Sequence, residues 1–358
     1  MIFMTQKFAA IITGPDTYLD HLGTLCYILK MPLFVTEKET YESALTFYPQ
    51  IETIYLQLQD LSAPFLMEHF DAIFESGKFF SMNLSPMIKI LSSKKLRFIY
   101  CPHGHSDKGH SAKQFASQDI SLVYGAHMQD LLKNTGALEK IETTVRTGNY
   151  RLTFYQKHKT FYDTLVANQI LPLLNPSNQT ILYAPSWQDG ENPTSFFTCV
   201  EKLIADLKNN FNLIIKLHPF LAEFHPAETF SILEKYKKSS DILFLNQFPC
   251  IYPLLQICDL YIGDYSSIGY DFLAFNKPLY FLIEKKAPLF AIHPCGMVIP
   301  PEENTSCFIH KTLKKNQLEK EALRKKIYRY AFGEEIPFDS LKQEITKAIL
   351  TEKKPALK

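Results

Sequence analysis

The stretch LYIGDYSSIGYDFLAFNKPLYFLI, residues 260–283, decides the fold, because it contains a strand, a helix and a second strand in succession. Its outer runs, LYIGD and PLYFLI, consist almost wholly of apolar residues instead of alternating apolar and polar ones. Such runs are typical of strands in a parallel sheet that is covered by helices on both faces. The stretch therefore predicts part of an α/β domain.

The same alternation extends from this stretch toward residue 180. We expect three further strands there, TILYAPS at 180–186, NLIIKLHP at 212–219 and DILFLN at 241–246. The segments 199–210, 229–238 and 252–259 have helical spacing of apolar residues and separate these strands. Together they predict one doubly wound α/β unit.

The first third of the chain repeats this organisation. We expect strands at 8–13, 32–36, 51–58, 96–101 and 120–125, with helices at 17–30 and 126–136. The turn formers NPSNQ at 175–179 precede the second unit. We therefore expect two Rossmann-like, doubly wound domains in a GT-B-like arrangement, with the ligand in the interdomain cleft. The predicted ranges are 1–155 for an N-terminal domain, 156–178 for a linker, 179–335 for a C-terminal domain, and 336–358 for a C-terminal helix and tail.

The composition narrows the class of protein. The chain has 358 residues, of which 46% are hydrophobic and 21% charged, and its net charge is +1. Two normal cores fit this length, and no overall positive field argues for a nucleic-acid partner. Seven cysteines without a CxxC pair indicate reduced thiols and a cytoplasmic protein. No signal peptide is evident and no apolar run reaches the ~18 residues of a membrane span. The 28 Phe and 19 Tyr fit large core side chains or a membrane-facing surface.

Residues just after the strands are the candidates for chemistry, because ligands of open α/β sheets bind beyond the carboxyl ends of the strands. After the strand that ends at Asp264, Ser266 and Ser267 lie where a helix begins, and Asp271 follows Ser267 by one helical turn. Hydroxyls and free N–H groups at a helix N-terminus can bind a phosphate. Ordinary N-capping by Ser and Asp is the alternative.

Two other strand ends in the second unit carry polar residues. KLHP places Lys216 inside a strand end and His218 at its exit, where a surface or core histidine is the plain alternative. The loop in LYAPSWQDG contains Ser186 and the only Trp of the chain. In the first unit, TGNYRLTFY carries Arg151, a cation that could meet a phosphate.

The turn CPHGHSDKGH at 101–110 raises the question of a metal. His103, His105, His110 and Asp107 are residue types that bind zinc. Two observations argue against a metal, however. A glycine-containing turn holds metal ligands in no fixed geometry, and the second unit already supplies residues that can bind a phosphate. A phosphate-binding or catalytic turn is the other interpretation, and Lys108 supplies a cation for it.

Five of these motifs, in this order along the chain, resemble the CDP-glycerol glycerophosphotransferases of teichoic-acid and related surface-polymer synthesis. The motifs are His103-Gly104, Gly148 to Arg151, Leu182 to Trp187, Lys216 to Pro219, and Asp264 to Asp271. The resemblance covers about residues 95–285. The chain departs from the family pattern at Gln188, where Arg is usual, and at HSDKG, where a Thr-Pro-Leu-Lys-like run is usual.

The resemblance implies a transferase whose N-terminal domain lies on the acceptor side and whose C-terminal domain binds the nucleotide donor. We expect no cofactor and no metal. A hydroxyl of a surface-polymer or lipid-linked acceptor attacks the β-phosphate of a CDP-alcohol, and CMP is released. The implied catalytic residues are His103 as base, with an ordinary pKa of about 6.5, and His218 as donor or acid at the pyrophosphate. The implied substrate-binding residues are Gly104, Lys108, Arg151, Ser186, Lys216, Asp264, Ser266, Ser267 and Asp271. Asp271 would hold the ribose, and Ser266 and Ser267 the phosphate.

Two other functions stay open. One is a nucleotide-sugar glycosyltransferase or UDP-sugar 2-epimerase of the same fold. The other is a catalytically silent sugar-phosphate-binding protein, for which the departure at Gln188 leaves room. Peripheral contact with the inner face of the cytoplasmic membrane is expected because the family acceptors are lipid-linked.

Overall fold

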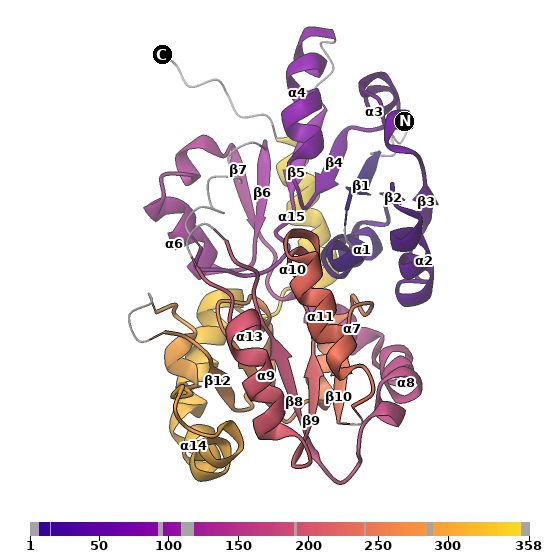
Figure 1. Cartoon of the computed structure of the whole chain (residues 1–358). Helices are drawn as coiled ribbons and strands as arrows, with labels where there is room; N and C mark the ends of the chain where they lie inside the picture. The colour runs from indigo at the N-terminus through magenta and orange to yellow at the C-terminus, as the bar shows by residue number, and fades with distance from the viewer. Residues whose placement is uncertain are drawn as a thin grey trace. The chain divides into compact units, whose positions relative to one another are not determined.

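The computed structural model describes residues 7–14, 16–91, 96–108, 118–189, 192–239, 241–284 and 289–351 (Figure 1). The chain forms two compact units. The first consists of Met1–His103, Lys108–Phe154 and Phe332–Lys358, and the second of Gly104–Asp107 and Tyr155–Ala331. His110 and Gly190, which belong to motifs considered above, lie outside the described residues.

The first unit is built on a parallel sheet with the strand order β3-β2-β1-β4-β5-β6-β7 (Figure 1). The chain moves outward from β1 through β2 and β3, then returns to the other side of β1 with β4. The order of strands therefore reverses between β1 and β4, which is the switch point of a doubly wound sheet. The strands are β1 Phe8–Ile12, β2 Leu33–Val35, β3 Thr53–Tyr55, β4 Ala72–Glu75, β5 Arg97–Tyr100, β6 Ile120–Val123 and β7 Thr143–Arg146.

Helices join these strands and form the outer layers of the first unit. They are α1 Leu19–Leu29, α2 Lys38–Phe47, α3 Ala63–His69, α4 Phe79–Leu91, α6 Ala126–Asn134 and, from the C-terminal segment, α15 Phe338–Leu350. Helix α7 Tyr150–Lys157 begins in the first unit and ends in the second. Helix α15 contacts α1 and β7, and Phe338 packs edge-on against Tyr27 with ring centroids 6.2 Å apart. The C-terminal helix, expected as a separate range, thus belongs to the first unit by its contacts.

The second unit repeats the design with a parallel sheet of order β10-β9-β8-β11-β12-β13. Its switch point lies between β8 and β11. The strands are β8 Gln179–Ala184, β9 Phe211–Ile215, β10 Ile242–Phe244, β11 Leu260–Gly263, β12 Leu279–Phe281 and β13 Met297–Val298. The helices are α8 Lys159–Gln169, α9 Phe196–Leu207, α10 Pro219–Phe224, α11 Pro226–Tyr236, α12 Ile251–Ile257, α13 Ile268–Phe272 and α14 Thr305–Phe332.

Each sheet has its own apolar core. In the second unit, Ile181, Leu213 and Ile262 from three strands pack with Leu203 of α9 at exposures of 1% or less. Burying an aliphatic side chain of this size contributes about 1.5–3 kcal/mol. The central strands β9 and β11 are buried along their whole length, and β8 is buried from Thr180 onward. This burial explains why their sequences are largely apolar. The prediction of two doubly wound parallel α/β sheets is confirmed.

The structure differs from the sequence-based expectation in several places. Strands β4, β7 and β13 were not expected, because their apolar runs are short and are interrupted by residues such as Glu75 and Arg146. The segment 156–178, expected as a linker, contains α8 and has its contacts within the second unit.

Candidate functional site

Asp264 organises the switch point of the second unit. It follows β11 directly and is 2% exposed. Its Oδ1 accepts hydrogen bonds from the backbone N–H groups of Ser186, at 2.7 Å, and Tyr265, at 2.6 Å. Its Oδ2 accepts from the N–H and the hydroxyl of Ser195, at 2.9 and 2.7 Å. With four donors on one carboxylate, Asp264 ties the loop after β8 to the loop after β11.

Ser186 lies in the loop that Asp264 holds. Its carbonyl accepts a hydrogen bond from the hydroxyl of Thr194 at 2.6 Å, so its backbone is fixed on both sides. Its own hydroxyl is buried and has no hydrogen-bond partner within the described part of the chain. Burying a hydroxyl without a partner costs free energy, which a polar ligand group or a water molecule would offset.

The turn after Asp264 presents Ser266 and Ser267 at the start of α13. Ser267 occupies the N-cap position, but its φ of −62° and ψ of −25° are helical and its side chain makes no capping hydrogen bond. The capping alternative therefore does not describe this hydroxyl. The Ser266 hydroxyl hydrogen-bonds to the phenol of Tyr261.

Gly104 packs directly on this turn, within the second unit. Its φ is +145°, and a Cβ placed on it would lie 2.5 Å from Oγ and 2.8 Å from Cβ of Ser267. No side chain fits at this distance, and the backbone conformation also disfavours one. The adjacent His105 is fully buried with its ring edge-on to Tyr270, so it offers no surface to an acceptor.

Asp271 lies inside α13 and is 2% exposed. Its Oδ1 accepts a hydrogen bond of 2.8 Å from the hydroxyl of Tyr252 on α12. This contact fixes the carboxylate one helical turn beyond Ser267, where the sequence predicts it to hold a ribose.

Lys216 and His218 follow β9, the neighbour of β8. Lys216 is 6% exposed, and its Nζ donates to the carbonyl of Phe248 at 2.9 Å. His218 caps α10, and its Nδ1 accepts from the backbone N–H of Phe220 at 3.2 Å. An amide N–H can only donate, so the ring proton of His218 is on Nε2. The indole of Trp187 lies beside this imidazole, with ring centroids 6.1 Å apart.

His103 lies in the first unit, after β5. Its Nδ1 is 3.1 Å from the carbonyl oxygen of Ser76, which follows the neighbouring strand β4. A carbonyl can only accept, so Nδ1 carries the proton and Nε2 keeps its lone pair. The ring packs against Tyr18 with centroids 5.1 Å apart and keeps an edge exposed to solvent.

Desolvation by the surrounding protein lowers the pKa of His103 below its ordinary value. The hydrogen bond to Ser76 opposes this shift, and the positive charge of the half-buried Lys108 adds to it. A lowered pKa keeps the imidazole neutral at pH 7, which is the form that a general base requires.

Arg151 forms a buried ion pair with Asp20 inside the first unit. It is 2% exposed, its Nη1 lies 2.7 Å from Oδ2 of Asp20, and its guanidinium lies over the ring of Tyr124. A buried ion pair of this kind loses much free energy when one partner is removed. The position favours a structural role over the phosphate contact that the sequence predicts.

The metal alternative receives no support from the described residues. Within the described ranges, no three His, Cys, Asp or Glu side chains are grouped as metal ligands. Asp107 instead accepts hydrogen bonds from the hydroxyl of Tyr270 and from the backbone N–H of Ala291. His110 is outside these ranges.

Several residues that support the site were not identified from the sequence. Ser76 orients His103 through a backbone carbonyl, which no side-chain pattern can reveal. Ser195 and Thr194 hold the switch-point loop, and only their place at the start of α9 hints at this. His293 donates from Nε2 to the carbonyl of Asp264 at 3.1 Å.

The structure thus brings Ser186, Asp264 and Gly104 to the carboxyl ends of the second sheet together with the serines of the α13 turn. Comparison with known proteins identifies the family of the chain. The family model described as CDP-Glycerol:Poly(glycerophosphate) glycerophosphotransferase matches residues 99–287, just over half of the chain. The chain belongs to this glycerophosphotransferase family.

The glycerophosphotransferase match agrees with individual relatives. The chain is 31% identical over 170 residues to the teichoic acid glycerol-phosphate primase of Bacillus spizizenii (strain ATCC 23059 / NRRL B-14472 / W23). This alignment covers 47% of the chain and 41% of the relative, so the chain matches less than half of that protein.

Solved structures share the fold of this glycerophosphotransferase chain. The wall teichoic acid polymerase TagF matches with a TM-score of 0.64 at 11% identity, covering 96% of the chain and 89% of that structure. The UDP-GlcNAc 2-epimerase of Neisseria meningitidis bound to UDP-GlcNAc matches with a TM-score of 0.60 at 13% identity, covering 96% and 100%. Both likenesses establish the GT-B-like fold. Across the residues that the structure describes, no helix has the length and hydropathy needed to cross a bilayer.

Proposed function

We propose that the protein transfers glycerol phosphate, or a related polyol phosphate, from a CDP-alcohol to a hydroxyl of a teichoic-acid-type acceptor. The family match supports this proposal, because residues 99–287 include His103, His218 and the switch-point serines. The departure at Gln188 falls on an exposed residue of the loop after β8.

The observation that carries the proposal is the protonation pattern of the two histidines. His103 has its lone pair on Nε2, whereas His218 has its proton on Nε2. One ring is therefore prepared to accept a proton and the other to donate one. A transfer reaction that deprotonates a nucleophile and neutralises a leaving phosphate requires both abilities.

The proposed step balances as follows. The acceptor hydroxyl oxygen attacks the β-phosphorus of the donor, and its proton passes to Nε2 of His103. The bond from the β-phosphorus to the bridging oxygen breaks, and CMP leaves with that oxygen. His218 donates a hydrogen bond to the pyrophosphate, and the turn at Ser266 and Ser267 binds phosphate oxygens. Asp264 acts through Ser186 by fixing its loop, and Asp271 is proposed to contact the ribose.

Donor binding tests this proposal. Titration calorimetry of the full chain should detect CDP-glycerol and CDP, and Ser267→Ala should weaken both. Ser231→Ala, which replaces a serine on the remote helix α11, is the control and should leave binding unchanged. Binding of UDP-GlcNAc without binding of CDP-glycerol would contradict the proposal and favour the epimerase or glycosyltransferase alternative. Binding without turnover on any acceptor would favour the silent binding protein.

Peripheral membrane contact is part of the same proposal, and α4 supports it. Phe79, Met82, Met87 and Ile90 are 43%, 53%, 47% and 85% exposed, at a spacing that places them on one face of the helix. Residues 76–95 contain four lysines and no acidic residue. An exposed apolar helix face in a segment that contains lysines and no acidic residue fits an anionic lipid surface.

Vesicle flotation tests this contact. The chain should float with vesicles that contain an anionic lipid, and Met87→Gln combined with Ile90→Gln should abolish flotation. Leu318→Gln, a change at a residue 63% exposed on α14, is the control and should leave flotation intact. Unchanged flotation of the α4 variant would show that α4 does not make the membrane contact.

A further inference from the structure

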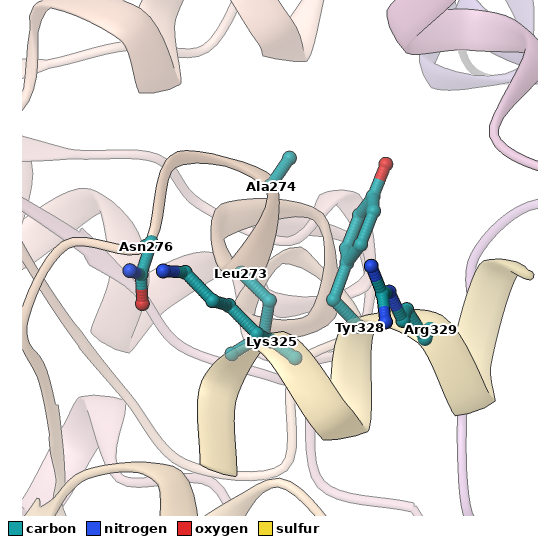
Figure 2. A pocket seen from close by; sticks show the side chains of 6 residues that line it. All are labelled: Leu273, Ala274, Asn276, Lys325, Tyr328 and Arg329. Atoms are coloured by element: carbon teal, nitrogen blue, oxygen red, sulfur yellow. The ribbon is translucent and has the colours of Figure 1, made fainter. Parts of the chain in front are cut away.

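A pocket of about 270 Å³ lies in the second unit, between the end of α14 and the turn Leu273–Phe275 that follows α13 (Figure 2). Its lining residues are Leu273, Ala274, Asn276, Lys325, Tyr328 and Arg329. The proposed donor site uses none of these residues. The pocket begins two residues beyond Asp271, at the end of α13 opposite to the serine turn.

Helix α14 places three polar side chains of the pocket on one face. Lys325, Tyr328 and Arg329 are spaced by three and four residues, so they are neighbours on the helix surface. The phenol of Tyr328 and the guanidinium of Arg329 extend side by side, and the amino group of Lys325 points toward Asn276 (Figure 2). Three groups that can donate hydrogen bonds therefore rise from the same wall.

The opposite wall of the pocket is rigid. Asn276 adopts a left-handed conformation with φ of +51°, and its Oδ1 accepts from Nε of Arg324 at 2.9 Å. Arg324 is itself fully buried and donates to the carbonyls of Asn316 and Gln317 at 3.0 and 2.8 Å. These contacts join the turn after α13 to α14.

The charge of α14 favours an anionic occupant. Thr305–Phe332 carries eight Lys and Arg residues and two Glu residues, whereas the net charge of the whole chain is +1. Positive charge is thus concentrated on one helix of a nearly neutral protein, and such a local field attracts polyanions.

Lys325 already pairs with Glu321, at 2.6 Å, but the two side chains are 63% and 41% exposed. Exposed ion pairs contribute little net free energy, so an incoming phosphate can take the place of the carboxylate. No residue that lines the pocket is acidic, and the half-buried Ala274 supplies a small apolar surface that fits the carbons of a short polyol.

We propose that this pocket binds one phosphodiester of a polyol-phosphate chain. Lys325 and Arg329 contact the phosphate oxygens, Tyr328 donates a hydrogen bond from its hydroxyl, and the polyol carbons lie on Ala274. That the bound polyol-phosphate chain is the acceptor of the reaction rests on the proposed function. Binding of a phosphodiester by the pocket does not depend on it.

Direct binding tests the pocket. The probe is a soluble poly(glycerol phosphate) chain of defined length, titrated calorimetrically onto the full protein at physiological salt. The double variant Lys325→Gln, Arg329→Gln should weaken binding about tenfold or more, because it removes two charge-assisted contacts. Ala274→Phe, which fills the pocket and leaves the charge unchanged, should weaken binding as well.

The matched control is Lys311→Gln, Lys314→Gln, which removes the same charge from exposed positions of α14 outside the pocket. Equal weakening by the control, or unchanged binding in the pocket variants, would overturn the proposal. Loss of binding to anionic vesicles with unchanged binding of the soluble chain would also overturn it, in favour of a lipid headgroup. The affinity for CDP-glycerol should be the same in all these variants. A failure of the proposed donor site would therefore be distinguishable from a failure of the proposed phosphodiester pocket.

Discussion

His103 and His218 carry their ring protons on opposite nitrogens. The Ser76 carbonyl accepts from Nδ1 of His103, and the Phe220 N–H donates to Nδ1 of His218. Backbone groups impose both states, because a carbonyl cannot donate and an amide N–H cannot accept. Each Nε2 is therefore assigned before any substrate binds, one as acceptor and one as donor.

Replacing His103 by Asn should lower kcat by about 10²–10⁴, the usual contribution of a general base. His69→Asn is the matched control, because the Nδ1 of His69 contacts the carbonyl of Phe65 at 2.9 Å, in the same way, on an exposed helix. The control should keep full activity. Similar kcat values for the two variants would exclude His103 as the base.

The pH dependence of kcat/KM should reflect the lowered pKa of His103. The neutral base is the active form, so the rate falls as pH drops through this pKa, and the acid limb should lie below the ordinary value of about 6.5. Removing the charge of Lys108 by Lys108→Gln should move the limb upward, because that charge lowers the pKa. A limb at or above 6.5 that does not respond to Lys108→Gln would contradict this assignment.

Replacing Gly104 by Ala should weaken CDP-glycerol binding and lower stability. The new Cβ would meet Ser267 Oγ at 2.5 Å and displace the turn that is proposed to bind phosphate. Gly14→Ala shares the strained backbone, with φ of +109°, but has no atom within 4 Å of the new Cβ. Thermal unfolding should therefore reveal strain in both variants, of about 1–3 kcal/mol, and calorimetry should detect weaker donor binding only for Gly104→Ala. Equal affinity of the Gly104→Ala and Gly14→Ala variants for CDP-glycerol would show that Gly104 does not contribute to the donor site.

Replacing Asp264 by Asn should lower the free energy of unfolding by about 1–3 kcal/mol and reduce activity. The amide offers one acceptor oxygen where the carboxylate offers two, so part of the four-donor network around Ser186 and Ser195 is lost. Asp259→Asn is the control at the other end of β11, where the carboxylate accepts from the N–H of Thr180. Urea unfolding should give a smaller loss for it and unchanged activity. An equal loss of activity would show that the effect is not local to the switch point.

Replacing Arg151 by Met should destabilise the protein by about 3–5 kcal/mol, because Asp20 would be left buried without its cation. The activity of the folded fraction should be preserved, and the double variant with Asp20→Leu should recover part of the stability. Normal stability together with lost donor binding would instead establish the phosphate contact that the sequence predicts.

The strand ends could be predicted from the sequence, and long-range pairings could not. Ser186, Asp264 and Ser267 were identified because continuous apolar strands end just before them, and parallel strands bring those ends to one edge. The role of Arg151 depends on Asp20, 131 residues away, and no local pattern encodes that pair. The orientation of His103 depends on a carbonyl after β4, a strand whose short run AIFE ends in a carboxylate. The pocket on α14 could not be predicted from the sequence, because the pattern of α14 is that of an ordinary charged surface helix and the opposite wall comes from the turn after α13.

The most direct test of the central claim is a turnover assay with CDP-glycerol and a lipid-linked glycerol-phosphate acceptor. We predict that CMP release and glycerol-phosphate incorporation occur in equal amounts, and that His103→Asn slows both by about 10²–10⁴ while His69→Asn preserves them. Turnover of a UDP-sugar with no CMP release from CDP-glycerol would contradict the account.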